Sequence, residues 1–334
     1  MRAMAFEKPG PIDSAPLALR DLPVPRPEAG EVLLRTRVCG VCHTDLHAVE
    51  GDLDLPRLPL VPGHQVVGTV EAVGPGVEGV RPGDRLGVAW LRGTCGRCGY
   101  CRSGRENLCP QARFTGLHAD GGYAEFLTVP ADFAYPIPAG FPDEQAAPLL
   151  CAGIIGYRAL VRCGIRPGGR LGIYGFGASA HVTIQIARHW GCEVYVCSRG
   201  ENHRRLAKEL GAIWVGAEAD ATPVPLNGSI LFAPAGNLVP PALAALDRGG
   251  TLALAGIHVS DIPAMTYHEH LFFEKTLTSV TANTRQDGRE FLELAAAIPV
   301  RTEVHTHPLE DANRVLGMLK RSEFSGAAVL DLRR

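Results

Sequence analysis

Thiols and imidazoles gather in a short stretch in the first third of the chain. Within VCGVCHTDLH, the six residues from Cys42 to His47 supply a thiol, a hydroxyl, a carboxylate and two imidazoles. Two more residues of the metal-binding type follow, His64 in PGHQVVG and Cys151 in APLLCAGIIGY. A catalytic zinc takes three such protein ligands and leaves its fourth position open. Cys42, His64 and Cys151 are therefore a candidate ligand set, and ordinary buried or solvated side chains are the alternative.

A second group of thiols lies in one glycine-rich loop. Cys95, Cys98, Cys101 and Cys109 are separated by two, two and seven residues. Such short spacing lets one loop fold its thiolates around a single tetrahedral ion, and four thiolates leave no position open for a substrate. The pattern predicts a structural zinc loop over residues 95–109. Two disulfides are an alternative, as is an iron–sulfur cluster, although the spacing lacks the usual iron–sulfur pattern.

A glycine turn follows a short strand-like run near residue 170. Gly175, Gly177 and Ala180 match G-x-G-x-x-G/A between a predicted strand and a predicted helix, which is the context that the motif needs. The first glycine allows a tight turn, and the second lets the backbone approach a pyrophosphate at the helix N-terminus. We therefore expect a dinucleotide site here, with a ligand-free turn as the alternative.

The next predicted strand bears on the choice of dinucleotide. It ends in Ser198 and Arg199, and no carboxylate occurs before Glu201. NAD-binding domains place an acidic residue on the adenosine ribose, whereas a hydroxyl and a guanidinium suit a 2′-phosphate. The sequence favours NADP over NAD, although Arg199 could equally lie on the adenine or face solvent.

Composition limits the class of protein. A chain of 334 residues is long enough for about two domains. The net charge of −2 gives no reason to expect a nucleic-acid or anionic-membrane partner, and the sequence contains neither a long apolar window nor a secretory signal. Without such a signal, ten cysteines indicate metal ligands or free thiols in a reducing compartment, so we expect a cytoplasmic protein without a membrane span.

The elements that must position these groups differ between the two parts of the chain. The first 150 residues are rich in Gly and Pro, and Val32–Val38, Val66–Val73 and Tyr123–Val129 have strand character. This part is predicted to form an all-β, partly open barrel. After Cys151 strands and helices alternate, which predicts a parallel sheet wrapped by helices. The predicted elements are strands at 170–174, 193–197, 229–232, 251–255, 276–280 and 327–332, and helices at 179–190, 201–210, 237–246 and 312–319.

The quoted motifs, with DGGYAEF between them, occur in this order in zinc-dependent medium-chain alcohol dehydrogenases. Over nearly its whole length the chain resembles the bacterial and yeast-like branch of that family. The resemblance implies an α/β protein with a GroES-like β-barrel catalytic domain over residues 1–151 and a Rossmann doubly wound parallel-sheet domain over 152–286. A C-terminal segment over 287–334 would complete the catalytic domain. It also implies a homo-oligomer, with a tetramer favoured over a dimer.

The same resemblance assigns roles to individual residues. Cys42, His64 and Cys151 correspond to catalytic zinc ligands. Thr44 and His47 correspond to a proton relay, His43 to a residue near the cofactor pyrophosphate, and Asp45 to a carboxylate that orients His64. The implied activity is the interconversion of alcohols with aldehydes or ketones by hydride transfer to or from NAD(P). A zinc-free enone or quinone reductase is one alternative, and an inactive binding protein of the same fold is another.

Three positions depart from the pattern or describe the pocket. Trp90 matches a substrate-pocket aromatic of the yeast-like branch, with a core tryptophan as the plain alternative. Leu53 stands where close relatives often have Trp, which implies a wider pocket. Gln65 replaces the glutamate that usually follows the ligand histidine, so a negative charge near the metal is missing.

Overall fold

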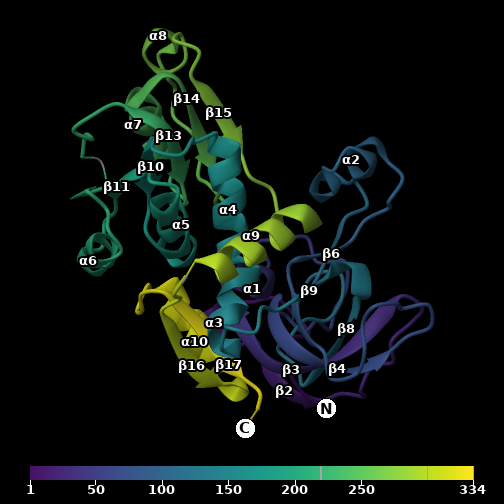
Figure 1. Cartoon of the computed structure of the whole chain (residues 1–334). Helices are drawn as coiled ribbons and strands as arrows, with labels where there is room; N and C mark the ends of the chain where they lie inside the picture. Colours follow the sequence, from purple (N-terminus) through teal and green to yellow (C-terminus); the bar gives the residue numbers. More distant parts are fainter. Residues whose placement is uncertain (219, 299, 334) are drawn as a thin grey trace. The chain divides into compact units, whose positions relative to one another are not determined.

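The computed structural model describes residues 1–218, 220–298 and 300–333, which form two compact units. Unit 1 comprises Met1–Cys151, Ala282–Ala296 and Thr302–Arg334, and unit 2 comprises Ala152–Thr281 and Ala297–Arg301. Both chain ends therefore belong to unit 1 (Figure 1).

Unit 1 is built on a seven-stranded sheet. Its order is β16 (Val304–Pro308), β17 (Ala327–Asp331), β3 (Glu31–Val41), β4 (Gln65–Val73), β5 (Arg85–Val88) and β9 (Ala134–Pro136), with β8 (Phe126–Pro130) also paired to β3. The pairings are antiparallel except β16 with β17, which are parallel. The long strand β3 pairs with three neighbours, so it fixes the register of the whole sheet. Gly40 on β3 lies opposite Gln65, directly after His64.

Short elements complete unit 1. Its two small sheets pair β1 (Arg2–Ala5) with β2 (Ala18–Asp21), and β6 (Leu91–Gly93) with β7 (Arg113–Phe114). The helices are α1 (His43–Glu50), α2 (Gly99–Arg102), α3 (Asp143–Ala146), α10 (Ala312–Lys320) and all but the last residue of α9 (Arg285–Ala297). The 3-10 turns are η1 (Ile12–Ser14), η2 (Glu106–Leu108), η3 (Ala131–Phe133), η4 (Ala147–Leu150) and η6 (Leu309–Asp311).

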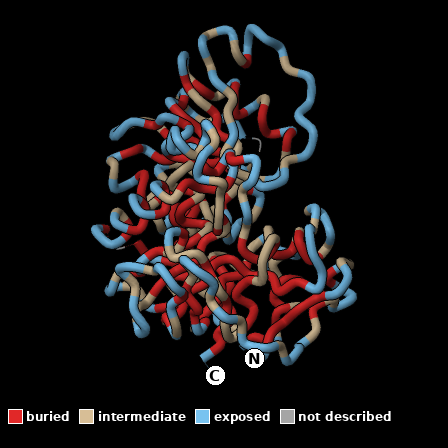
Figure 2. Tube along the Cα trace, turned by 90° about the vertical axis from the view of Figure 1, so that its right-hand side faces the viewer, coloured by how far each residue is buried: buried red, intermediate tan, exposed pale blue. Residues whose placement is uncertain are grey.

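Apolar side chains from segments distant in sequence form the core of unit 1. Val32 and Leu34 of β3 pack with Leu127 and Val129 of β8, and α10 contributes Leu316. Figure 2 shows buried segments (red) running through the interior near the two termini, with exposed segments (blue) at the edge. Cys42, directly after β3, and His64, directly before β4, are thus attached to closely packed strands of this sheet.

Unit 2 holds a six-stranded sheet in which all pairings are parallel. The order is β12 (Trp214–Gly216), β11 (Glu193–Cys197), β10 (Arg170–Tyr174), β13 (Leu226–Leu231), β14 (Leu246–Leu254) and β15 (Thr276–Ser279). Counted along the chain this is the order 3-2-1-4-5-6 of the Rossmann fold. It confirms the prediction of a doubly wound parallel sheet.

Helices cover the sheet of unit 2. They are α4 (Ala152–Cys163), α5 (Ala178–His189), α6 (Glu201–Glu209), α7 (Val239–Ala244) and α8 (Tyr267–His270), with the 3-10 turn η5 (Gly236–Leu238) before α7. α5 and α6 pack against β11, and α4 and α7 against β14. Helices α4 and α5 approach closely at Gly156, where an added Cβ would lie 2.1 Å from Oγ1 of Thr183. Glycine is therefore required at that crossing.

The predicted elements of unit 2 occur in the structure, but several of their ends differ. The strands predicted at 229–232 and 251–255 begin earlier, at Leu226 and Leu246, and the helix predicted at 237–246 consists of η5 followed by the shorter α7. β10 and β11 span the residues predicted, and α5 and α6 differ from prediction by about one residue at their ends, within the usual uncertainty of such boundaries. Helices α4 and α9 were not predicted. In unit 1 the strand predicted at 123–129 begins only at Phe126, because Gly122 and Tyr123 form a bend whose N–H groups bond to the carbonyls of Gly63 and Pro62.

Among the described residues, no single helix has the length and apolar character needed to cross a membrane. One bent pair, Asp143–Leu150 with Ala152–Cys163, meets that test by length and composition only.

Candidate metal and cofactor sites

Three ligand-type side chains from three elements of unit 1 converge. Cys42 is the N-cap of α1, His64 immediately precedes β4, and Cys151 directly follows η4. Their ligand atoms lie within 4.8 Å of one another, and Sγ of Cys42 is 3.4 Å from Nε2 of His64. The structure therefore brings together the three residues that the sequence singled out.

A buried carboxylate holds two of these residues in place. Asp45 is 2% exposed and accepts hydrogen bonds from the backbone N–H of Cys42 (3.0 Å) and of Gly63 (3.1 Å). Its Oδ1 lies 2.9 Å from Nδ1 of His64, and the hydroxyl of Tyr123 donates to Oδ2 at 3.4 Å. The contact through Nδ1 leaves Nε2 of His64 facing Cys42, where a metal would bind.

The charges around this cluster suit a cation. The hydrogen bond with Cys151 lowers the pKa of Cys42 well below that of an ordinary thiol, and the same bond, with burial, raises the pKa of Cys151. Burial opposes a charge on His64, but the attraction of Asp45 and Cys42 outweighs it and raises the pKa of His64. One proton shared between two sulfurs is what a bound cation displaces. Two sulfurs and one nitrogen thus fit zinc.

Helix α1 presents further polar groups next to Cys42. His43, Thr44 and His47 lie on its first turns, and the His43 and His47 rings are 6.4 Å apart between centroids. Nδ1 of His47 lies 2.8 Å from Oδ2 of Asp52. Burial lowers the pKa of His43, which keeps its imidazole neutral near pH 7. The sequence had not singled out Asp52.

Aromatic rings lie beside His64. Trp90 follows β5, and its ring is 6.4 Å from that of His64. It stacks on Phe114 at 4.1 Å, and Phe114 in turn lies 5.6 Å from the ring of His118. Sequence reasoning missed Phe114, the stacking partner of Trp90, and His118, which lies beside Phe114. Leu53 is half-buried in the loop after α1.

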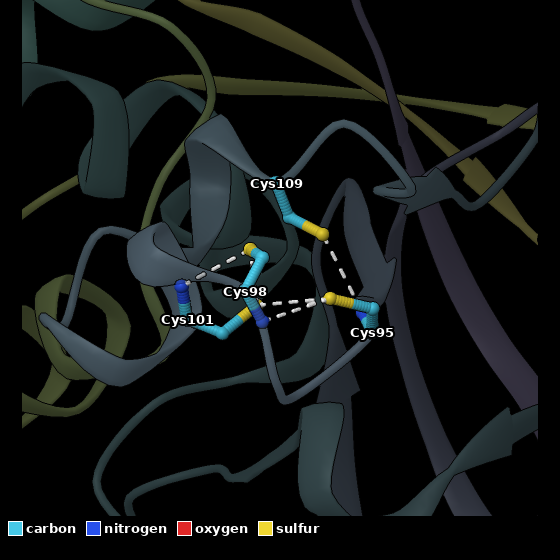
Figure 3. Close-up of side chains that lie close together, drawn as sticks. All are labelled: Cys95, Cys98, Cys101 and Cys109. Carbon is cyan, nitrogen blue, oxygen red and sulfur yellow. Dashed lines mark hydrogen bonds between the residues drawn. The ribbon is translucent and has the colours of Figure 1, made fainter.

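The four-cysteine loop forms a second cluster in unit 1. The sulfurs of Cys95, Cys98, Cys101 and Cys109 lie within 4.8 Å of one another, and Figure 3 shows the four side chains converging. All ten cysteines of the chain lie in its described part, and all are free of disulfides. The disulfide alternative is therefore not what the structure contains.

Backbone N–H groups point at these sulfurs. The N–H of Cys98 donates to Sγ of Cys95 at 3.3 Å, and the N–H of Cys95 donates to Sγ of Cys109 at 3.4 Å. Backbone donors from Arg97 and Cys98 lower the pKa of Cys95 to about 6. The loop is thus prepared to carry thiolates around a tetrahedral ion. Glu106 ties it to the start of α9 by accepting from the N–H of Arg285 at 3.0 Å.

The glycine turn of unit 2 joins β10 to α5. Gly175 has φ +86°, and an added Cβ would lie 2.8 Å from the backbone nitrogen of Ala233, so only glycine fits. Gly177 is the N-cap of α5, and a Cβ there would meet nothing within 4 Å. Ala180 is fully buried on the first turn of α5. This arrangement leaves the N-terminus of α5 open to a pyrophosphate.

The end of β11 carries basic groups. Ser198 is buried, whereas the Arg199 side chain is 79% exposed and lies 3.6 Å from a carboxylate oxygen of Glu218. Arg204 of α6 donates to the carbonyls of Ser198 and Arg199, both at 2.7 Å, and so fixes the loop between them. The sequence did not identify Arg204, because its role depends on how α6 folds back on the strand.

Comparison with known proteins agrees with both units. Residues 28–139 match the family described as "Alcohol dehydrogenase GroES-like domain", and residues 178–297 match "Zinc-binding dehydrogenase". The chain is 54% identical over 335 aligned positions to a probable alcohol dehydrogenase, AdhA, of Mycobacterium tuberculosis, covering 99% of this chain and 97% of that one. It is 38% identical to an alcohol dehydrogenase of Geobacillus stearothermophilus, with 94% and 96% covered.

Solved structures agree as well. A cobalt- and zinc-bound thermostable alcohol dehydrogenase from Pyrobaculum aerophilum superposes with TM-score 0.90 at 29% identity, covering 99% of each chain. An acetophenone reductase from Geotrichum candidum in complex with NAD gives 0.88 at 26%, covering 99% of this chain and 96% of that one. A zinc-binding dehydrogenase from Sinorhizobium meliloti bound to NADP gives 0.87 at 26%, covering 99% and 98%.

Fold, site chemistry and relatives agree. Unit 1 holds two clusters of zinc-type ligands, and unit 2 has a Rossmann sheet with a pyrophosphate turn. Family models match residues 28–139 and 178–297, and the relative from Mycobacterium tuberculosis aligns with 99% of the chain. The chain belongs to the zinc-dependent medium-chain alcohol dehydrogenases, enzymes that interconvert alcohols with aldehydes or ketones using NAD(P).

Proposed function

We propose that Cys42, His64 and Cys151 hold the catalytic zinc of this dehydrogenase. The observation that carries the proposal is the convergence of the three ligand atoms within 4.8 Å, with Asp45 in contact with Nδ1 of His64. When bound, zinc supplies Lewis acidity that makes the hydroxyl of an alcohol more acidic. Asp45 then serves to orient His64, and it stays out of the reaction itself.

The proton of the alcohol leaves along α1. Thr44 and His47 are three positions apart on the helix, so their side chains lie on the same face. We assign the first transfer to the Thr44 hydroxyl and the exit to His47, whose side chain is 21% exposed and can exchange with water. His43, neutral because of burial, is assigned to the neighbourhood of the cofactor pyrophosphate.

A second, structural zinc is proposed for Cys95, Cys98, Cys101 and Cys109. Four sulfurs within 4.8 Å fill a tetrahedral site and leave no position for a substrate. The expected stoichiometry is therefore two zinc ions per chain. Because the loop is tied to α9 through Glu106 and Arg285, loss of this ion should loosen unit 1 without removing a reacting group.

The cofactor belongs to unit 2, which we assign as the cofactor-binding domain, with unit 1 as the catalytic domain. Gly175, Gly177 and Ala180 would hold the pyrophosphate. NADP is proposed as the preferred dinucleotide, because Ser198 and Arg199 stand at the end of β11 where NAD-binding domains carry a carboxylate. The pairing of Arg199 with Glu218 is weak and exposed, so the guanidinium is free to turn to a phosphate.

The substrate pocket is assigned to Trp90 and Leu53. The Trp90 ring lies beside His64 and is held by stacking on Phe114. Leu53 is smaller than the tryptophan common in close relatives, and we propose that it admits alcohols longer than ethanol. Comparable kcat/KM for ethanol and for longer alcohols in the natural enzyme and in Leu53→Trp would refute this.

Assembly and location complete the proposal. Ile257, Ile262, Tyr267 and Phe272 are exposed apolar side chains within one stretch of unit 2, where β15 is also an edge strand. Such features favour association of copies, so we propose a homo-oligomer, with a tetramer favoured over a dimer. Ten free cysteines favour a reducing compartment, hence the cytoplasm. Light scattering on purified enzyme tests the assembly.

Metal analysis combined with kinetics tests the central proposal. The purified enzyme should hold two zinc ions per chain and oxidise alcohols faster with NADP than with NAD, across a panel of primary, secondary and aromatic alcohols. Cys42→Ser should lose one zinc and its turnover, while keeping the other zinc. Full turnover by protein stripped of its ions would contradict the proposal and favour the zinc-free reductase.

A further inference from the structure

His47, assigned as the last residue of the proton relay, has a carboxylate partner that no sequence motif indicated. Nδ1 of His47 lies 2.8 Å from Oδ2 of Asp52. A carboxylate can only accept hydrogen bonds, so the hydrogen of a neutral His47 imidazole sits on Nδ1 and points to Asp52. The other nitrogen, Nε2, then carries the lone pair and is the atom able to take a proton.

The chain holds Asp52 in this place by a glycine turn at the end of α1. Gly51 has φ +86°, and the backbone N–H groups of Gly51 and Asp52 both donate to the carbonyl of His47, at 3.1 and 2.9 Å. An added Cβ at Gly51 would lie 2.9 Å from Cβ of Pro9. The helix end therefore folds back and aims the carboxylate at its own histidine.

Other charged groups around this helix have partners of their own. Glu50 pairs with Lys320 of α10 at 2.8 Å and accepts from the N–H of Ile12. Asp13 of η1 lies 3.4 Å from Arg321. His43 on the same helix contributes a neutral ring 6.4 Å away. Asp52 is thus a carboxylate in direct contact with His47, in surroundings where neighbouring charges are paired.

We propose that Asp52 is a positioning residue of the proton relay. It keeps the hydrogen of neutral His47 on Nδ1, so that Nε2 receives the proton that leaves the alcohol. Water then takes the proton and His47 returns to the neutral form, so no electrons move in this step. The proposal rests on the assignment of Thr44 and His47 as the relay.

If Asp52 only stabilised the fold, its loss would lower the melting temperature and would leave the rate of proton release unchanged. The Asp52 side chain is 59% exposed, and exposed ion pairs contribute about 0–1 kcal/mol to stability. Loss of the carboxylate should therefore leave the melting temperature nearly unchanged. It should slow proton release, and a base added to the buffer should restore the rate, because the base can take the proton directly.

The test measures proton release with a pH indicator after the zinc-loaded enzyme with bound cofactor is mixed with alcohol, at low and high imidazole concentration. At low imidazole, Asp52→Ala and Asp52→Asn should each slow proton release and lower kcat on the order of tenfold. This is less than the full contribution of a general base, because His47 itself is still present. KM for the alcohol should stay the same, and imidazole should restore the rate. Asp52→Glu should recover much of it.

Two comparison variants separate the possible outcomes. Asp54→Asn removes an exposed carboxylate of the same loop and should behave like the natural enzyme. His47→Gln should be slower than either Asp52 variant and should respond to imidazole. If His47→Gln is impaired and Asp52→Ala is not, the role of Asp52 is wrong while the relay stands. If His47→Gln is also unimpaired, the relay assignment itself fails.

Discussion

Oδ1 of Asp45 lies 2.9 Å from Nδ1 of His64, and both side chains are almost completely buried. The same carboxylate accepts from the N–H of Cys42 and so joins two of the three proposed ligands through a single side chain. Cys42 and Asp45 are three positions apart in one capping turn, and this spacing is enough to make the link. Metal binding in unit 1 should therefore depend on Asp45 although it is not a ligand.

Replacement of this carboxylate by an amide is the first prediction. In Asp45→Asn a single oxygen remains to accept hydrogen bonds from the N–H groups of Cys42 and Gly63 and from His64. The new NH₂ group would face one of these donors and cannot accept a hydrogen bond from it. Affinity for the catalytic zinc should fall about 10–100-fold, as is usual when the partner of a ligand histidine is lost. Competition with a chelator, followed by zinc analysis, measures this.

Tyr123→Phe is the matched control for Asp45→Asn, because it removes only the longest contact of the same carboxylate, 3.4 Å. Its zinc affinity should stay within about threefold of the natural value, which corresponds to less than about 1 kcal/mol. The four-cysteine zinc should be retained in both variants. Wild-type zinc affinity in Asp45→Asn would show that Asp45 does not hold the site.

The four-cysteine loop gives the second prediction. Cys95→Ser should remove one zinc per chain and lower the free energy of unfolding by about 4 kcal/mol or more, because loss of a structural metal is among the largest single-residue effects. Zinc analysis and thermal unfolding check both parts. Cys192→Ala, a buried thiol outside both clusters, should keep two zinc ions. Equal zinc content in Cys95→Ser and the natural protein would rule out the structural site.

Cofactor choice gives the third prediction. If Arg199 binds the 2′-phosphate, Arg199→Ala should lower kcat/KM for NADP about 30-fold, the equivalent of one charged hydrogen bond of about 2 kcal/mol, and leave the value for NAD unchanged. Initial rates with both dinucleotides measure the ratio. Arg205→Ala is the control, since Arg205 is an exposed arginine paired with Glu209 on α6. An equal effect on NAD and NADP would place Arg199 elsewhere on the cofactor.

Features encoded by neighbouring residues could be predicted from the sequence. β10, the glycine turn and β11 depend on local pattern, and so does the four-cysteine loop, since its ligands lie within 15 consecutive positions. The convergence of Cys42 with Cys151 could not follow from spacing, because it requires the whole sheet of unit 1. There the family resemblance supplied what local chemistry could not.

The residues and helices that the sequence analysis did not identify also differ in whether a local pattern marks them. Asp52, Phe114 and Arg204 act through contacts made only after a turn or helix folds back, so no short pattern marks them. Helix α9 did carry a signal: Thr284 and Asp287 exchange hydrogen bonds as a capping box ahead of it. Helix α4 begins inside an unbroken apolar run, APLLCAGIIGY, in which no polar face indicates a helical period.

His181 is a buried group that the proposed chemistry does not use. It lies on the first turns of α5, 1% exposed, and neither ring nitrogen has a hydrogen-bond partner in the described part of the chain. Burial lowers the pKa of His181 to about 4. The imidazole is therefore neutral in the folded protein at pH 5, whereas in the unfolded chain, with a pKa near 6.5, it is protonated.

Acid should therefore destabilise unit 2 through this residue, which is the fourth prediction. Between pH 6.5 and 4 the unfolded chain binds a proton that the folded protein does not, so stability falls as the pH falls through this window. From pH 7.5 to pH 5 the loss should be about 2 kcal/mol. His181→Leu should lack this loss, so its free energy of unfolding in urea should gain about 2 kcal/mol relative to the natural protein on going to pH 5. A constant difference between His181→Leu and the natural protein across this pH range would show that the imidazole is already protonated in the folded state.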